Sequence, residues 1–224
     1  MLCRATIIFS VLALATPAIA QTSSSESNQS TTADSSNSMD PPQVGDHWTY
    51  ELRDEITGTL KFTTVNVVTQ VTSGDIAIRG ENLGNPGFIY LVYDHSWNLK
   101  DNSVWKYSPS DGSGIKAPLK VGSNWNFQST DVYAARGLSY KRSGSAKVVA
   151  QETITTAAGT FDTFKIETAA TSRSANDPTK KSDLLLTTWY APSVDHWVKR
   201  VSRVTLNGHV DEDFSYELID YGRR

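Results

Sequence analysis

The stretch that decides the fold is VKRVSRVTLNGHVDEDFSYELI, residues 198–219. Val, Thr, Phe and Tyr, which are enriched in β-strands, stand on both sides of Asn207-Gly208. An Asn-Gly pair between two such runs favours a two-residue hairpin turn, because both turn positions need positive φ. We therefore predict two antiparallel strands, over 198–205 and 210–219.

Comparable strand and turn signals extend from this hairpin towards the N-terminus. Residues 60–65 and 148–156 are rich in Thr and Val, and Ala158-Gly159-Thr160 separates two such runs as in a hairpin. Only residues 132–136 could form a helix, and that stretch is short. We count about ten strands without helices between them. This predicts an all-β fold with little helix, either an antiparallel β-sandwich or an open barrel.

The pattern Val-Gly-x-x-Trp-x-aromatic occurs twice, as VGDHWTY at 44–50 and as VGSNWNF at 121–127. In both halves a β-branched run, an aromatic strand and an Asp-His pair with a nearby tryptophan follow in the same order. The two pairs are Asp94-His95-Ser96-Trp97 and Asp195-His196-Trp197. We predict a single β-rich domain over 44–224 that is built from two duplicated halves, about 44–120 and 121–224.

The aromatic residues of each repeated segment lie two positions apart, so in a strand they point to the same face. The structural core is therefore predicted to contain Trp48 and Tyr50 from the first segment, and Trp125 and Phe127 from the second. Aromatic side chains bury large areas and contribute strongly to a core.

Trp97 and Trp197 take matching places in the two halves, each after an Asp-His pair. Tryptophan is enriched among the residues that dominate binding energies. We predict that the two rings lie exposed at one end of the barrel as binding residues, with His95 and His196 as polar neighbours. The alternative is that both rings close the ends of the core.

Sequence motifs of catalysis and of cofactor binding are absent from the chain. The four histidines form neither His-x-His nor His-x-x-x-His, and Asp211-Glu212-Asp213 lacks the surroundings of an EF-hand loop. Neither Gly-x-Ser-x-Gly nor Gly-x-Gly-x-x-Gly occurs. We predict no metal, no cofactor and no enzymatic activity, while carboxylates from distant parts of the chain leave glycoside hydrolysis open.

The N-terminus has the features of an exported protein. Arg4, an apolar segment and Ala18-Ile19-Ala20 predict a cleavable signal peptide over 1–20. Residues 21–43 are dominated by Ser, Thr, Asn and Gln, which predicts a disordered tether. The single cysteine, Cys3, precedes the apolar segment, whereas the modified cysteine of a lipoprotein would follow it. We predict a periplasmic or secreted protein that is not a lipoprotein.

Charge and hydropathy exclude two classes of partner. The formal net charge is -3, so no basic excess points to nucleic acid. After signal cleavage no apolar run approaches the ~20 residues of a membrane-spanning helix. Lys199, Arg200 and Arg203, together with Lys180-Lys181, form a mildly basic patch that we interpret as solvated strand faces.

Several segments resemble one bacterial group, the TapB-like secreted or periplasmic domains of unknown function. The resemblance rests on AAGTFDTFKIE (157–167) and TTWYAPS (187–193), supported by the opening segment 44–50 and by SYEL (215–218). It covers most of the chain from Val44 to Tyr221. The resemblance implies a β-domain located in the cell envelope and transfers no catalytic residue.

Three functions are compatible with these features. The first is a non-enzymatic domain that binds an envelope component, which is a polysaccharide, a lipid or a partner protein. The second is a hydrolase that acts on envelope polymers with dispersed carboxylates. The third is a structural accessory protein whose sheet edge pairs with another protein. Exposed tryptophan in a cleft would favour the first function.

Overall fold

The computed structural model describes residues 41–223, which form twelve β-strands and one short 3-10 helix, η1. The first six strands are β1 (His47–Asp54), β2 (Leu60–Val71), β3 (Ile76–Asn82), β4 (Ile89–Tyr93), β5 (Leu99–Asp101) and β6 (Lys106–Ser108). The others are β7 (Asn124–Tyr133), β8 (Leu138–Thr156), β9 (Gly159–Ser174), β10 (Lys181–Ala191), β11 (His196–Leu206) and β12 (His209–Gly222), with η1 (Ala134–Arg136) after β7.

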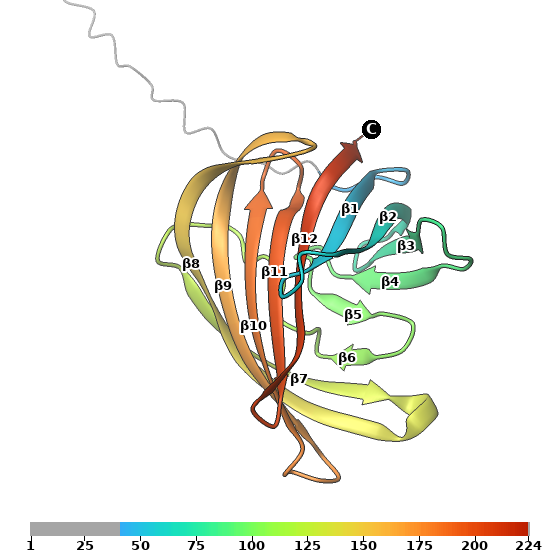
Figure 1. Ribbon diagram of the computed structural model, residues 1–224, viewed down its shortest axis with the longest axis vertical. Helices are drawn as coiled ribbons and strands as arrows, with labels where there is room; N and C mark the ends of the chain where they lie inside the picture. The colour runs from blue at the N-terminus through green and yellow to red at the C-terminus, as the bar shows by residue number, and fades with distance from the viewer. Residues whose placement is uncertain (1–40, 224) are drawn as a thin grey trace, which may run out of the picture. The chain divides into compact units, whose positions relative to one another are not determined.

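Each strand pairs antiparallel with the next one along the chain, and β1 also pairs with β12, so the sheet closes into a barrel (Figure 1). The predicted all-β class with little helix is confirmed. The architecture is a closed barrel, however, and neither a sandwich nor an open barrel. Pairing β1 with β12 satisfies the backbone groups that two free edges would leave exposed.

The hairpin predicted around Asn207-Gly208 is confirmed. Leu206 lies opposite His209, and the two turn residues have φ values of 49° and 87°. Asn tolerates a left-handed conformation better than most residues do, and Gly adopts it without steric cost. The local sequence therefore determines this turn, while a bulge between Val204 and Thr205 shifts the register of β11 and β12 beyond it.

The loops alternate between the two ends of the barrel because neighbouring strands run antiparallel. One end, which we call the closed end, carries the start of β1, the end of β12 and the long connection between β6 and β7. The opposite end, which we call the open end, carries the β9–β10 and β11–β12 connections at the bottom of Figure 1.

The buried core lies at the closed end. Its members come from the starts of β1, β3 and β11 and from the ends of β8, β10 and β12, and they include Trp48, Ile76, Val148, Tyr190 and Leu218. Ile115, from the long β6–β7 connection, is also buried there. This connection therefore helps to fill the closed end of the barrel.

Inward-facing positions near the open end are much more exposed. Strand register aligns Trp48, Asn66, Gly80 and Ile89 across four strands, so that they share the inner face, yet Ile89 is 49% exposed. Leu206 is 44% exposed. Side chains just fill the interior of a barrel of about eight strands. In this wider barrel the core fills one half, and we call the other half the open lumen.

The turns before β1 and β7 have the same geometry. Gly45 and Gly122 have φ values of 94° and 93°. Their amides donate to the carbonyls of Val68 and Val148, respectively. The strands that follow differ in length between the halves, since β2 has 12 residues and β8 has 19. The local likeness is clear, while duplication of the complete halves stays a prediction.

A half-length fragment is expected not to fold on its own. Residues 44–118 contain β1 to β6 but lack β12, which pairs with β1, and the parts of the core that β8 to β11 supply. We expect the fragment to show no cooperative unfolding transition in urea, whereas the complete chain unfolds cooperatively. A fragment with a sharp transition and dispersed amide resonances would indicate two independent domains.

Residues 1–40, with the predicted signal peptide and nearly all of the predicted tether, lie outside the described residues. Within residues 41–223, no helix combines the length and the apolar character needed to cross a membrane.

Candidate ligand-binding lumen

The floor of the open lumen is an aromatic cluster at the closed end, which surrounds the imidazole of His196. Trp48 stacks on this ring at a centroid distance of 4.4 Å and an interplanar angle of 19°. Trp97 meets it edge-on at 4.6 Å, and the centroid of Trp197 lies 3.6 Å from it. His196 is 1% exposed. The cluster brings together β1, the β4–β5 turn and the start of β11.

Hydrogen bonds determine which nitrogen of His196 carries the proton. Tyr50 Oη donates to the carbonyl of Trp197 at 2.7 Å and lies 2.5 Å from His196 Nδ1. Since the single hydroxyl proton goes to the carbonyl, Nδ1 must donate to the phenol oxygen. Nε2 is then a bare acceptor, and it is buried without a partner. Burial, followed by the positive charge of Arg200, lowers the pKa of His196 well below its ordinary value.

A second polar group, centred on Asp195, stabilises the closed end. The Asp195 carboxylate accepts hydrogen bonds from Tyr190 Oη at 2.7 Å and from Trp97 Nε1 at 3.2 Å. Arg223 lies 4.0 Å from Asp195 and 3.2 Å from Asp46. Burial raises the pKa of the Asp195 carboxyl, and its hydrogen bonds and Arg223 act against that rise. The carboxylates of Asp46 and Asp195 are both buried and share the Arg223 cation, so we interpret them as structural groups that stabilise the closed end.

Three of the four predicted binding residues lie together, but they are buried. Trp97 and Trp197 are 2% and 7% exposed and belong to the core cluster, and His196 is buried between them. Both tryptophans are at the same end of the barrel. Their burial differs from the expected exposure, because the Asp195 network and the neighbouring rings enclose them. A binding role for them stays a prediction.

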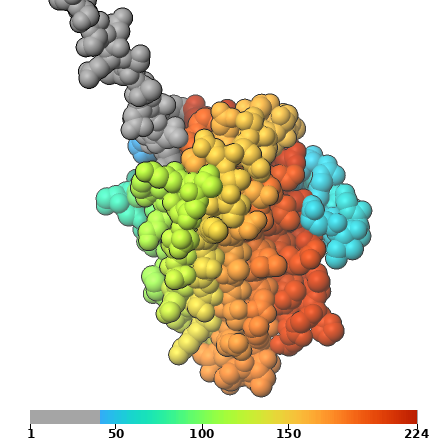
Figure 2. All heavy atoms as spheres, turned by 90° about the vertical axis from the view of Figure 1, so that its left-hand side faces the viewer, coloured from blue at the N-terminus to red at the C-terminus, as the bar shows by residue number. Residues whose placement is uncertain are grey.

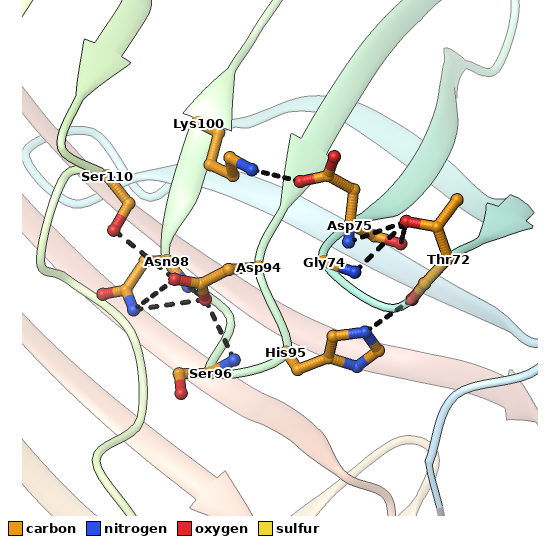
Figure 3. Close-up of polar contacts among 9 residues, drawn as sticks. All are labelled: Thr72, Gly74, Asp75, Asp94, His95, Ser96, Asn98, Lys100 and Ser110. Atoms are coloured by element: carbon orange, nitrogen blue, oxygen red, sulfur yellow. Dashed lines mark hydrogen bonds and ion pairs between the residues drawn. The ribbon is translucent and has the colours of Figure 1, made fainter.

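His95 lies apart from this group, on the turn between β4 and β5 (Figure 3). Its Nε2 is 2.8 Å from the carbonyl oxygen of Thr72, and its side chain is exposed. The neighbouring Asp94 carboxylate accepts hydrogen bonds from the amides of Ser96 and Asn98, both at 2.9 Å. These bonds shape the turn that gives Trp97 its positive φ of 59°. Asp94 and His95 therefore hold the turn whose tryptophan enters the core.

The four predicted core residues differ in burial. Trp48 and Tyr50 are 0% and 1% exposed, whereas Trp125 and Phe127 are only half-buried. Trp125 packs against the core from the start of β7. A Cβ atom on Gly144 would lie 2.5 Å from the Phe127 ring, so this ring covers the glycine backbone farther towards the open lumen. The second aromatic pair thus borders the core instead of occupying its centre.

Arg200 lies on the inner side of the barrel, next to Trp197 of the aromatic cluster. It follows Val198 on the inner face of β11 and lies opposite Thr188 of β10 and Tyr216 of β12. Its guanidinium carbon is 3.5 Å from the centroid of the Trp197 ring. Its Nε and Nη2 are buried without a hydrogen-bond partner, although the residue as a whole is partly exposed. Burial is the main cause that lowers the pKa of this guanidinium.

A second inward arginine, Arg142 of β8, has a partner. Its Nη2 lies 2.7 Å from the buried carboxylate of Asp131, which also accepts a hydrogen bond from Ser129. Tyr107 packs beneath the guanidinium at 5.3 Å, and burial raises the pKa of its phenol to about 12. A cavity of about 210 Å³ opens here, lined by Trp105, Tyr107, Asp131, Tyr140, Arg142, Ser172, Ser182 and Leu206.

Sequence reasoning missed these lumen residues. Arg200 had been grouped with Lys199 and Arg203 as part of solvated strand faces, but only the latter two point outward. The period of two places Arg200 on the same face of the strand as Val198, but it does not show that this face is the buried one. Among residues 41–223, no three His, Cys, Asp or Glu side chains lie close enough together to hold a metal ion.

The fold is shared with solved structures of bacterial proteins. A candidate lipoprotein from Parabacteroides distasonis has a TM-score of 0.55 and 15% identity, over 81% of this chain and 97% of that chain. A candidate exported protein with a YmcC-like fold from Bacteroides fragilis has a TM-score of 0.51 and 16% identity. The match covers 82% of this chain and 98% of the B. fragilis chain. The hypothetical lipoprotein YmcC from Escherichia coli has a TM-score of 0.47 and 15% identity, over 80% and 86%.

At these identities the likeness concerns the fold alone. No protein-family model and no curated protein matches the chain, so the resemblance to the TapB-like group stays a prediction. A candidate lipoprotein is among the proteins that share the fold, which contradicts the prediction that this protein is not a lipoprotein. That exclusion was wrong, because it depended only on the place of Cys3, in a segment outside the described residues.

Proposed function

We propose that this protein is a non-enzymatic binding protein of the cell envelope, and that its open lumen takes a small amphipathic ligand with an anionic group. The observation that carries the proposal is Arg200, whose Nε and Nη2 are buried at the floor of the lumen without a partner. The buried Asp111 carboxylate attracts this guanidinium electrostatically, but burying a cation without hydrogen bonds is still costly. A carboxylate or phosphate at this place would accept two parallel hydrogen bonds from the guanidinium.

The walls of the lumen suit the apolar part of such a ligand. Ile89 and Leu206 face inward and are about half exposed, so an alkyl chain against them would remove apolar surface from water. Arg142 is neutralised by Asp131, which leaves Arg200 as the cation available to the anionic group. In this proposal the anionic group of the ligand contacts Arg200 at the floor, and its apolar part lies against the walls nearer the mouth of the barrel.

The alternatives fit the structure less well. The buried carboxylates Asp46 and Asp195 are held by Arg223 inside the closed end, where a polymer from solution has no access. This arrangement does not favour a hydrolase. Closure of the sheet through β1 and β12 removes the long free edge on which the edge-pairing function depends.

The test uses two probes with the same alkyl chain length. Dodecanoate carries an anionic carboxylate, and dodecanol carries a neutral hydroxyl group in its place. Trp197 lies directly below Arg200, so intrinsic tryptophan fluorescence should report binding. We expect dodecanoate to bind and Arg200→Met to weaken that binding at least about tenfold, since hydrogen bonds to charged groups contribute ~1.5–3 kcal/mol. Dodecanol should bind weakly to both forms.

The variant should fold normally, which separates binding from stability. The substitution removes the desolvation cost of a buried cation, but it also removes the attraction between that cation and the buried Asp111 carboxylate. Because these two effects oppose each other, Arg200→Met should melt at about the same temperature as the parent. Lys199→Gln is the matched control, because it removes a charge from the outer face of the same strand. Equal dodecanoate affinity of Arg200→Met and the parent, or no binding to the parent, would refute the proposal.

A further inference from the structure

The outer face of the barrel carries a row of basic side chains. Strand register places Lys141 of β8 opposite Arg173 of β9, and Arg173 opposite Lys181 of β10. Like charges directly opposite each other destabilise a sheet. Lys181 is neutralised by Asp183 at 2.8 Å. Among residues 41–223, neither Lys141 nor Arg173 forms a close ion pair, although the Asp183 carboxylate also attracts Arg173 electrostatically.

A groove of about 740 Å³ lies beside these two cations. Hydroxyl groups from Thr130, Ser143 and Thr171 line it together with Lys141 and Arg173, and none of its lining residues is acidic. Arg142 also lines the groove, but Asp131 neutralises this side chain. The groove therefore contains two cations that form no close ion pair, and several small hydroxyl side chains that can form hydrogen bonds.

The groove continues across the barrel wall. It shares Gln128, Ser143 and Thr171 with a second hollow of about 690 Å³, which extends towards Leu185 of β10. The outward side chains along this path are small, as at Ser145 and Ala169, so the surface is hollowed between the strands. Figure 2 shows the outer face of β8, β9 and β10, in yellow to orange. The second hollow also holds the carboxylate of Asp183, which accepts a hydrogen bond from Thr171, so only the basic hollow suits an anionic group.

We propose that this outer groove binds an acidic polysaccharide. Carboxylates on the sugars would pair with Lys141 and Arg173, and sugar hydroxyls would bond to the serine and threonine side chains of the floor. No aromatic residue lines the basic hollow, so it lacks the stacking platforms that bind single-stranded nucleic acid. A groove also does not match the plane of a membrane surface. Because the whole chain has a net charge of -3, the attraction must come from this local site.

The experiment is a calorimetric titration of the complete protein with oligogalacturonate at low ionic strength. The double variant Lys141→Gln/Arg173→Gln should bind at least about tenfold more weakly, because both charge-assisted contacts are lost. The matched control is Lys116→Gln/Lys120→Gln, which removes the same charge from the long β6–β7 connection at the closed end and should bind like the parent. Added salt should weaken binding to the parent.

The other outcomes overturn the proposal. The proposal is wrong if the groove double variant binds oligogalacturonate as tightly as the parent does, or if the control variant loses as much affinity as the groove variant. It is also wrong if the parent binds neutral maltooligosaccharide as tightly as oligogalacturonate, or if it binds an oligonucleotide or anionic vesicles in place of oligogalacturonate. The groove double variant should fold normally. Because it removes the repulsion between Lys141 and Arg173, its melting temperature should equal or exceed that of the parent. Arg200→Met should retain oligogalacturonate binding, which separates this groove from the lumen.

Discussion

Trp97→Ala is expected to lower the free energy of unfolding by about 3–5 kcal/mol, the usual cost of truncating a buried tryptophan. The ring is 2% exposed and contacts Trp48, Tyr93, His196 and Trp197 at centroid distances of 4.6 to 6.2 Å. Its removal leaves a cavity in the centre of the closed end. It also removes one of the hydrogen bonds that the buried Asp195 carboxylate accepts. Urea denaturation followed by circular dichroism measures the loss.

Two further variants show whether this cost comes from the core. Trp48→Ala should lose stability to a similar extent, because Trp48 is fully buried in the same cluster. Trp105→Ala should lose less, because Trp105 is half-buried near the open end and, among the rings of residues 41–223, contacts only Tyr133 and Tyr140. A nearly unchanged midpoint for Trp97→Ala would contradict the buried position and would restore the hypothesis of an exposed binding ring.

The local structure follows from short stretches of sequence, whereas closure does not. Asn207-Gly208 alone predicts the β11–β12 turn, and the Val-Gly-x-x-Trp pattern marks the starts of β1 and β7. Closure depends on β1 pairing with β12, where Trp48 lies opposite Tyr221. Nothing in either segment specifies a partner at such a distance along the chain. The same strands could also have packed as two sheets, so the sequence left both architectures open.

The floor of the lumen was partly predictable. The matching Asp-His-Trp places indicated that the two tryptophans would lie at one end of the barrel. Their burial was not predictable, because the Asp195 carboxylate that accepts a hydrogen bond from the Trp97 indole is 98 residues away. Arg200 was missed for another reason. In VKRVSRVT a charged residue stands on each face of the strand, so alternation by itself did not show which face was buried.

Stability is expected to fall as the pH drops below about 6.5, and His196 should account for up to about 1.4 kcal/mol per pH unit of this fall. Burial, Arg200 and Arg223 lower the pKa of His196 in the folded protein well below its ordinary value. The unfolded chain then binds a proton at this histidine that the folded protein does not bind. The contribution is complete above pH 6.5 and decreases steadily below it.

The geometry of His196 shows why the folded protein resists this proton. Nδ1 already donates to Tyr50, so the second proton would have to go to Nε2, which is buried without an acceptor. His196→Asn can keep a donor near Tyr50 but cannot titrate. We therefore expect this variant to be less stable than the parent at pH 8, because the stacking on Trp48 is lost, and to show a flatter dependence of stability on pH.

The slope, and not the absolute stability, is the decisive measurement. Urea unfolding at a series of pH values from 8 to 5 gives it for each variant. His95→Asn is the matched control, because it removes a histidine whose side chain is exposed in the folded protein. Equal slopes for His196→Asn and the parent would mean that His196 takes up a proton in the folded barrel. In that case the closed end would have to open to water at mildly acidic pH, and the buried floor beneath Arg200 would be accessible to ligands after all.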